Sequence, residues 1–257
     1  MRLRDSTKSR TAERVADLSS HFRRYLTRFR EANRFSGPSL HFHLRTVDRL
    51  RQHADAASAI GDETYLEMLY ATLAAWGLHR MGPGNAKLRD FSEFAPNARS
   101  VFERAAAFYG RSILDLDDPS ARDVGRQIGR VIEAHKGDAG LTLAESVLVA
   151  NSKALHHFLP DLVPPVDRAY TLMFFFQRTD APGSAAETFE VIFPWFAAVA
   201  RQNAGVIRDA VACANRSGGA CQWDTSHGKV LDNALMGWIH ANRNGGSRRS
   251  SPVTDPS

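Results

Sequence analysis

The sequence has only two cysteines, Cys213 and Cys221, and no long apolar segment. Two cysteines are too few for the disulfide framework of a small secreted domain. We therefore expect ordinary buried or loop thiols in a reducing, cytoplasmic setting. No window approaches the run of about eighteen apolar residues that a membrane span needs, so we predict no membrane association. The basic N-terminal residues lack the apolar stretch of a secretory signal.

Several common catalytic motifs are also missing. The glycines between Gly82 and Lys87 do not have P-loop spacing, and no serine or threonine follows the lysine. The dinucleotide fingerprint Gly-x-Gly-x-x-Gly, the nucleophile elbow Gly-x-Ser-x-Gly and the zinc motif His-Glu-x-x-His do not occur. These absences remove P-loop NTPases, dinucleotide-binding oxidoreductases, common serine hydrolases and zincins from the leading candidates. We predict no cofactor and no metal site.

The net charge of +5 is concentrated at the two ends of the chain. Residues 1–34 hold ten Lys and Arg against four Asp and Glu, and residues 243–257 hold three against one. Residues 35–242, between these two ends, therefore carry a slight net negative charge. This distribution fits either a solvated basic surface, which is the commoner case, or a dedicated phosphate-binding surface near the N-terminus.

Apolar residues recur at helical spacing through most of the chain, and strand signals are nearly absent. The segment 63–78 is apolar nearly all round, which is typical of a helix buried at the centre of a domain. We predict an all-α protein with about nine helices in one globular domain, residues 9–242. A flexible N-terminus, 1–8, and a disordered basic tail, 243–257, are expected to flank it.

Several expected helices carry start signals. Asp118 is expected to cap one helix, with Pro119 in its first turn, and Pro165 to open another that continues to Phe176. Ser184 and Glu187 have capping-box spacing. The first helix is expected to carry its apolar stripe from residue 15 to residue 29 without a break. Thr225 or Ser226 is expected to cap the last helix.

The densest group of polar residues lies in residues 151–170, NSKALHHFLPDLVPPVDRAY. Lys153 precedes a pair of histidines, and a turn bounded by prolines then delivers Asp167 to the start of a helix. Free backbone N–H groups and the helix dipole favour an ionised carboxylate at that position. Such a carboxylate can cap the helix, orient a histidine or act as a base.

The pattern from Lys153 through Pro164-x-Val166-Asp167 to Tyr170 resembles a degenerate helix-hairpin-helix DNA glycosylase core. That family is all-α. Its glycine hairpin, followed by a lysine in bifunctional members, leads to a Pro-h-Asp segment whose aspartate stabilises a cationic sugar or activates the nucleophile. The resemblance implies these catalytic roles for Lys153 and Asp167.

The same resemblance places Asn151 and Ser152 where the hairpin glycines of the family approach a phosphate. Residues 151–170, together with residues 70–81, also resemble segments of an uncharacterised family of bacterial helical proteins. We attach no activity to that second likeness.

The leading hypothesis is a nucleic-acid-associated helical domain with DNA as its partner. It combines the glycosylase-like residues with the basic first helix, and it expects the arginines of that helix to share a face with Lys153 and Asp167. Phosphate contacts are then expected from Arg23, Arg24, Arg28, Arg30, Asn151 and Ser152.

Two other hypotheses stay open. A non-catalytic helical interaction module, in a bacterial defence or mobile-element setting, expects Lys153, His156 and Asp167 to act as caps and surface ion pairs. A small-molecule hydrolase or lyase instead uses His157 together with Asp167 as its catalytic residues. Asp167 as a plain N-cap is commoner than Asp167 as a catalytic group.

A second pair of charged residues lies near the C-terminus. Lys229 and Asp232 are three residues apart, so they can pair on one face of a helix. If they turn toward Lys153 and Asp167, a polar pocket between helices becomes the default site. Aromatic residues such as Trp76 are expected to belong to the core.

Overall fold

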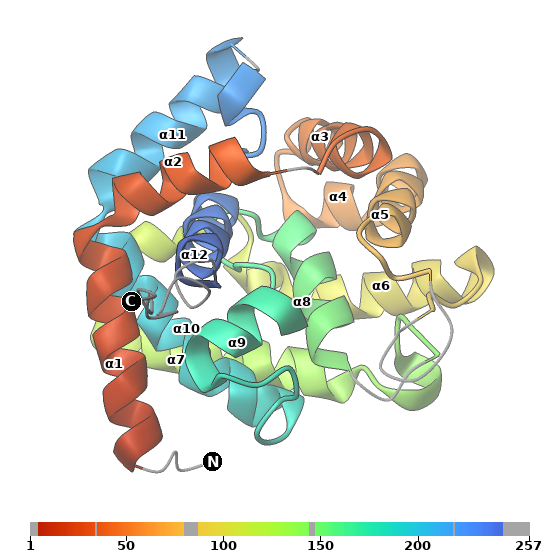
Figure 1. The fold of residues 1–257 in the computed structure, drawn as a ribbon. Coiled ribbons are helices and arrows are strands. Elements are labelled where there is room, and N and C mark those ends of the chain that lie inside the picture. Colours follow the sequence, from red (N-terminus) through yellow and green to blue (C-terminus); the bar gives the residue numbers. More distant parts are fainter. Residues whose placement is uncertain (1–4, 34, 80–86, 144–146, 218, 244–257) are drawn as a thin grey trace, which may run out of the picture.

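The computed structural model describes residues 5–33, 35–79, 87–143, 147–217 and 219–243, and Figure 1 shows their arrangement. Over these ranges the prediction of an all-α fold is confirmed, because no extended strand occurs and only isolated bridges are present. No helix in the same ranges combines the length and apolar character required to cross a membrane. The α-helices are α1 (Asp5–Ser20), α2 (Phe22–Ala32), α3 (Pro38–Leu50), α4 (Ala56–Gly61), α5 (Glu63–Ala75), α6 (Phe91–Ala105), α7 (Asp118–Ala134), α8 (Val147–Phe158), α9 (Met173–Phe176), α10 (Ala185–Gln202), α11 (Ala204–Ser217) and α12 (His227–Arg243).

The expected count of about nine helices is low because short helices and breaks divide the expected segments. The expected first helix is divided at His21, whose φ of −119° leaves the helical region, and α2 then runs in a new direction (Figure 1). The His21 imidazole lies 2.9 Å from the Asp17 carboxylate at this break. The apolar spacing alone did not reveal the break because both helices keep their apolar faces on the same core.

The helix α1 begins at Asp5 and therefore includes part of the segment predicted as flexible, residues 1–8. An acidic residue in the first turn favours a helix start. Thr11 and Arg14 anchor the helix by donating hydrogen bonds to the Phe175 carbonyl, at 2.8 and 2.9 Å. Residues 1–4 and 244–257, which include nearly all of the predicted tail, lie outside the described residues.

The centre of the domain is where the sequence predicted it. Tyr65, Leu66, Leu69 and Leu73 of α5 are fully buried. One continuous apolar cluster includes them and reaches from Val15 in α1 to α12. A core of this extent is what one globular domain requires. A second, smaller buried cluster consists of Phe29, Trp223 and Met236.

The capping signals of α7 and α10 were accurate to within a residue. Ser184 and Glu187 form the predicted capping box at the start of α10. At α7 the capping side chain is that of Asp117, which accepts from the Ser120 amide, and not that of Asp118, as predicted from the sequence. Aspartate is a good N-cap at either position, so the sequence did not distinguish them.

The chain between α8 and α9 does not become helical at Pro165, as the sequence predicted. It stays extended until Asp167, and a π-helical turn (Arg168–Leu172) precedes α9. The Leu172 amide donates to the Asp167 carbonyl at 3.0 Å, five residues back. Short π-helical segments of this kind are frequent at functional sites.

Two glycines let α12 pack closely against neighbouring backbone. A Cβ atom on Gly237 would overlap the Tyr25 carbonyl of α2, and one on Gly228 would lie 2.7 Å from the Pro160 carbonyl. The Gly228 amide also donates to that carbonyl at 3.1 Å. Both α2 and the turn after α8 therefore lie so close to α12 that a residue with a Cβ atom does not fit at position 237 or 228.

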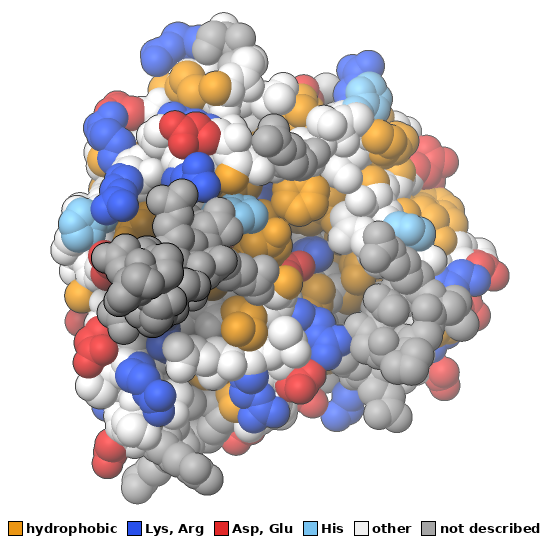
Figure 2. All heavy atoms as spheres, viewed as in Figure 1, with side chains coloured by type: hydrophobic (Ala, Val, Ile, Leu, Met, Phe, Trp, Pro, Cys, Tyr) orange, Lys and Arg blue, Asp and Glu red, His pale blue; other side chains and the backbone are white. Residues whose placement is uncertain are grey.

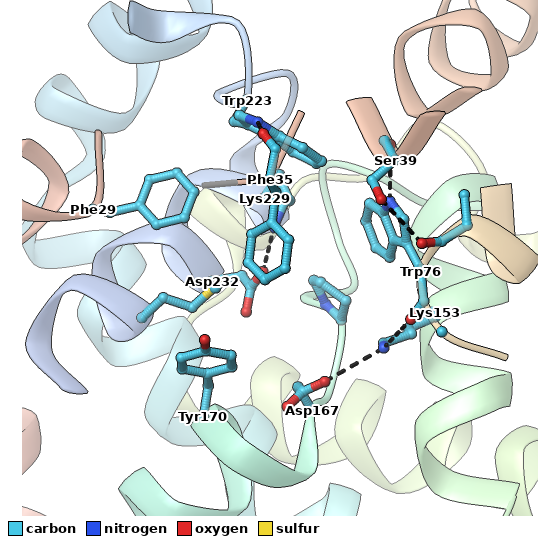
Figure 3. A pocket seen from close by; sticks show the side chains of 14 residues that line it. Phe29, Phe35, Ser39, Trp76, Lys153, Asp167, Tyr170, Trp223, Lys229 and Asp232 are labelled. Carbon is cyan, nitrogen blue, oxygen red and sulfur yellow. Dashed lines mark hydrogen bonds and ion pairs between the residues drawn. The ribbon is translucent and has the colours of Figure 1, made fainter. Parts of the chain in front are cut away.

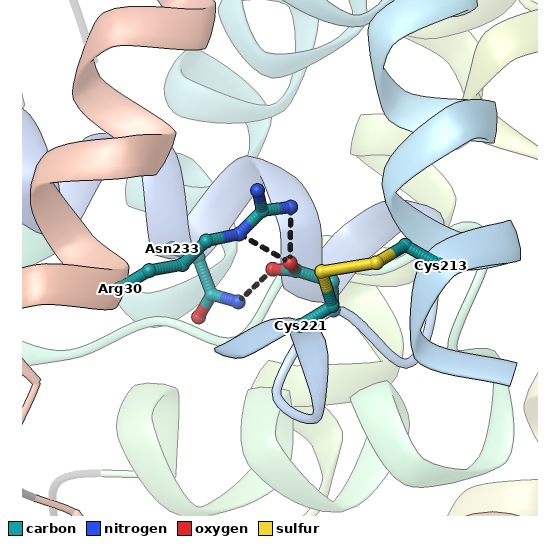
Figure 4. The surroundings of a disulfide bond; sticks show 5 residues. Arg30, Cys213, Cys221 and Asn233 are labelled. Carbon is teal, nitrogen blue, oxygen red and sulfur yellow. Dashed lines mark hydrogen bonds and ion pairs between the residues drawn. A yellow bond between two sulfur atoms is a disulfide. The ribbon is translucent and has the colours of Figure 1, made fainter. Parts of the chain in front are cut away.

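The structure corrects the expectation of free thiols, because Cys213 and Cys221 form a disulfide (Figure 4). The bond joins α11 to the short 3-10 turn Gly219–Cys221 that follows it, across a Cα–Cα distance of 6.0 Å. Disulfides are uncommon in reducing compartments. The bond therefore removes one argument for a cytoplasmic location, which stays a prediction.

We expect Gly237→Ala to lower the free energy of unfolding by about 1 to 3 kcal/mol, because the added methyl group forces α12 away from α2. Urea unfolding followed by circular dichroism measures this change. The control is Gly205→Ala in α11, where a Cβ atom meets nothing within 4 Å. Equal stabilities of the two variants would contradict the close approach.

We expect reduction of the disulfide to lower the free energy of unfolding by about 2 to 3 kcal/mol, because a closed loop of this length restricts the unfolded chain. Thermal unfolding with and without dithiothreitol measures the effect. In a Cys213→Ser variant the reductant is expected to change nothing. Detection of two reactive thiols in the untreated, unfolded protein would show that the bond does not form.

Candidate functional site

A pocket of about 310 Å³ opens between α2, α5, α8 and α12. Figure 2 shows a hollow on this face in which hydrophobic side chains surround a few charged ones. The close-up in Figure 3 shows that its lining comes from distant parts of the sequence. The volume is within the range typical of small-molecule sites.

Five aromatic side chains line the pocket: Phe29, Phe35, Trp76, Tyr170 and Trp223. Both indoles are held in place by hydrogen bonds to backbone. Trp76 donates to the Ser39 carbonyl at 3.2 Å, and Trp223 donates to the Phe35 carbonyl at 3.1 Å. Because these rings are fixed by the fold, they offer a preformed surface on which a flat ligand can stack.

The structure brings Lys153 and Asp167 together in the pocket, 3.4 Å apart (Figure 3). Lys153 comes from α8, and its ammonium also lies 3.4 Å from the Trp76 carbonyl. Its side chain is 9% exposed, whereas that of Asp167 is 34% exposed. The pair is therefore accessible from the pocket mainly through its carboxylate.

Asp167 also serves as a helix cap. Its Oδ1 atom accepts a hydrogen bond from the Ala169 amide at 2.8 Å, and its Oδ2 atom faces Lys153. Its own amide donates to the Thr171 hydroxyl at 3.0 Å. Capping and pairing use different oxygens, so one role does not exclude the other.

Lys229 and Asp232 of α12 form the predicted pair, with 2.5 Å between Nζ and Oδ2, and they line the same pocket. Their side chains are only 6% and 7% exposed. Burial raises the pKa of Asp232, and the neighbouring Lys229 charge opposes this rise. The Asp167 carboxylate also acts to raise this pKa and the Lys153 ammonium to lower it, since both groups line the same pocket.

His157, the third predicted catalytic residue, lies behind the wall of the pocket and is fully buried. Its ring contacts the Trp76 ring edge to face, with 4.8 Å between centroids. Its Nδ1 donates to the Lys153 carbonyl at 2.8 Å, because a carbonyl only accepts. The bare Nε2 then accepts from Nδ1 of His43 at 3.0 Å, and the Thr225 hydroxyl donates to Nε2 of His43 at 2.8 Å.

This hydrogen-bond chain holds neutral histidines in defined tautomers. Burial lowers the pKa of His157 to about 4, and it lowers the pKa values of His43 and His156 well below the ordinary value. Neighbouring positive charges act in the same direction for all three rings. The three imidazole rings are therefore neutral and buried, and they pack against Trp76 and Trp223.

Asn151 and Ser152 are also buried and serve the fold. The Asn151 amide donates to the carbonyls of Ile132 and His135 at 2.9 Å, at the end of α7. The Ser152 hydroxyl accepts from the Val166 amide at 3.1 Å and so ties the segment that carries Asp167 to α8. Neither side chain is open to a phosphate in this structure.

The arginines of α2 do not line the pocket. Arg30 turns inward and holds the buried Asp224 carboxylate through Nε and Nη2, at 2.9 and 2.6 Å (Figure 4). Arg23, Arg24 and Arg28 line a separate depression, which Ala241 of α12 also borders. The single basic face expected from the sequence is therefore divided between structural and solvent-facing roles.

Sequence reasoning missed the aromatic wall. Trp76 was assigned to the core, and Phe29 belongs to the regular apolar stripe of α2. An aromatic residue has the same spacing whether it faces the core or a cavity. The only pointer to the pocket was the condition that Lys229 and Asp232 turn toward Lys153 and Asp167, and the structure fulfils it.

Comparisons with family models, with curated proteins and with solved structures found no match. The candidate site therefore depends on its geometry alone. Among the described residues, no group of three or more His, Cys, Asp or Glu side chains is arranged to hold a metal ion.

We expect the free energy of unfolding to fall as the pH drops from about 7 toward 4. The unfolded chain binds protons at its histidines below about pH 6.5, whereas folded His157 stays neutral down to a pKa of about 4. For this residue the loss between pH 7 and 5 is roughly 2 kcal/mol. Denaturant unfolding at both pH values measures it.

His157→Gln is expected to remove that part of the pH dependence, whereas His41→Gln, at an exposed position of α3, is expected to leave it unchanged. A His157→Gln variant with the pH dependence of the unaltered protein would show that this histidine is not held neutral.

Proposed function

We propose that this protein acts on nucleic acid and holds a nucleobase in the aromatic pocket, with Lys153 and Asp167 facing the sugar. The observation that carries the proposal is the Lys153–Asp167 pair inside a cavity of about 310 Å³ with aromatic walls. Enzymes that act on a base extrude it from the duplex into a pocket of this kind. Stacking on an aromatic side chain contributes about 1 to 3 kcal/mol per base.

The two residues have complementary chemistry for breaking an N-glycosidic bond. The base leaves with the bonding electrons, and positive charge develops on the sugar. The Asp167 carboxylate is suited to stabilise that charge, as the glycosylase resemblance implies. Water then adds to the sugar carbon and gives a proton to the departing base, or the Lys153 ammonium gives that proton to the base and its free amine adds instead. The amine adduct becomes an imine when the sugar ring opens and the ring oxygen takes up a proton, and borohydride reduces this imine to a stable cross-link.

Arg23 and Arg24 supply the contact with the nucleic acid backbone in this proposal. Both are exposed on the outer side of α2, whose inner side provides Phe29 to the pocket. Arg28 lies beside them and is paired with Glu31 at 3.7 Å. A backbone bound by these arginines must pass around α2 for its base to reach the pocket, because the arginines line a separate depression.

The second candidate is a non-catalytic interaction module. It is favoured by the structural use of the glycosylase-like residues: Asp167 caps a helix, and Asn151 and Ser152 are buried in the fold. In that case the protein binds no nucleic acid. A titration with oligonucleotides therefore separates the two candidates.

We expect fluorescently labelled duplex and single-stranded oligonucleotides to bind at low salt and to lose affinity steeply as salt rises, because phosphate contacts release counterions. Arg23→Gln, Arg24→Gln and Arg28→Gln are each expected to reduce the slope of log affinity against log salt by about 1. The control is Arg126→Gln on the exposed side of α7. Absence of binding at low salt would refute the proposal.

We expect Asp167→Asn to bind oligonucleotides normally and to lose base release from duplexes that carry damaged bases. Asparagine caps a helix as well as aspartate does, so the fold should persist while the negative charge is lost. Lys153→Gln is expected to abolish the borohydride cross-link. Base release at the unaltered rate by Asp167→Asn would rule out the catalytic role.

A further inference from the structure

The sugar chemistry proposed above uses only one of the two ion pairs in the pocket. The other pair, Lys229 and Asp232, lies deeper and is nearly excluded from solvent. Burial of an ion pair is costly because both charges lose their hydration, and it often contributes nothing to stability. Stability of the fold therefore does not by itself explain why Lys229 and Asp232 lie in a cavity of ligand size, and we look for a role in binding.

Aromatic rings surround the Lys229 ammonium. It lies 5.3 Å from the Trp76 ring centre, 5.4 Å from that of Trp223 and 6.0 Å from that of Phe29. These cation–π contacts hold the charge in place next to the surfaces on which a flat ligand would stack. Asp232 follows three residues later on the same face of α12.

We propose that Lys229 and Asp232 recognise the hydrogen-bonding edge of a guanine-type base in this pocket. The inference rests on the proposed function, because it names the class of base that the pocket holds. It makes Lys229 and Asp232 specificity-determining residues, whereas Lys153 and Asp167 address the sugar.

The unused hydrogen-bonding capacity of the pair supports this assignment. An ammonium has three N–H donors, and among the described residues Lys229 makes one hydrogen bond, to Asp232. The Asp232 carboxylate likewise accepts only that one bond from the described part of the chain. A donor and an acceptor therefore lie side by side at the wall of the cavity.

Guanine presents the complementary groups on one edge. Its O6 atom accepts a hydrogen bond, and its N1–H and 2-amino groups are adjacent donors that a carboxylate can accept together. Adenine has only its 6-amino donor beside an unprotonated ring nitrogen, so the carboxylate gains one partner at most. Discrimination is strong when the wrong ligand leaves a buried polar group unpaired.

Lys153 and Asp167 are less suited to recognise the edge of a base. Asp167 already accepts the Ala169 amide with one oxygen, and its side chain is 34% exposed against 7% for Asp232. Hydrogen bonds at a solvated carboxylate discriminate little, because water replaces a missing partner. The deeper pair is therefore the one that can select a base.

The test is a titration with guanosine, inosine and adenosine, followed by quenching of tryptophan fluorescence, since Trp76 and Trp223 line the pocket. We expect guanosine to bind about ten- to a hundredfold more tightly than adenosine. Inosine, which lacks the 2-amino group, should fall between them. Asp232→Asn should abolish the preference for guanosine, because the asparagine side chain has an NH₂ donor in place of one acceptor oxygen of the carboxylate.

The matched control is Asp209→Asn, an exposed position on α11, which should keep the preference for guanosine. Circular dichroism checks that both variants are folded. Equal affinities for the three nucleosides, or an undiminished preference in Asp232→Asn, would overturn the inference and leave the base pocket intact. Failure of all three to quench would also overturn it, and the oligonucleotide titration then decides separately on the proposed function.

Discussion

The close packing of α12 is the constraint on which the rest of the site depends. Gly237 allows the helix to meet the α2 backbone, and Gly228 allows its first turn to meet the turn after α8. Because α12 carries Lys229 and Asp232, these two contacts set their distance from Phe29 on one side and from Asp167 on the other. A helix displaced by the width of a methyl group would alter both walls of the pocket.

Buried polar groups in this region limit the cost of desolvation in two ways. His43 and His157 stay neutral and share a directed hydrogen-bond chain that ends at Thr225. Neutral His156 donates to the Val163 carbonyl through Nδ1, and its Nε2 has no partner among the described residues. The lysines and aspartates in front of them are paired with opposite charges. Neutral imidazole rings can pack against the tryptophans without requiring water to solvate a charge. Charged side chains beside a cavity can instead exchange a hydrogen bond within the pair for one to a ligand.

The segment that resembles a glycosylase core combines structural contacts with an ion pair that lines the pocket. Ser152 ties down the extended chain, Asp167 caps the π-helical turn that follows, and its second oxygen faces Lys153. The structural contacts hold the carboxylate in position, which is what a preorganised site requires. Capping alone therefore does not exclude a role of Asp167 in chemistry, because it uses only one carboxylate oxygen.

The sequence by itself determined the features that depend on neighbours a few residues away. The helical period predicted the all-α class and the buried position of α5, and residue spacing predicted the capping box at Ser184 and the pairing of Lys229 with Asp232. These features are local because helix geometry places residues three or four apart on one face.

Only the tertiary structure decided which side chains meet across the chain. Arg30 finds its partner 194 residues away at Asp224, so its charge serves the core and not a basic surface. Trp76 and Trp223 become pocket walls because α2, α5, α8 and α12 leave a cavity between them. No local spacing encodes such contacts, since they depend on how closely the backbones approach one another.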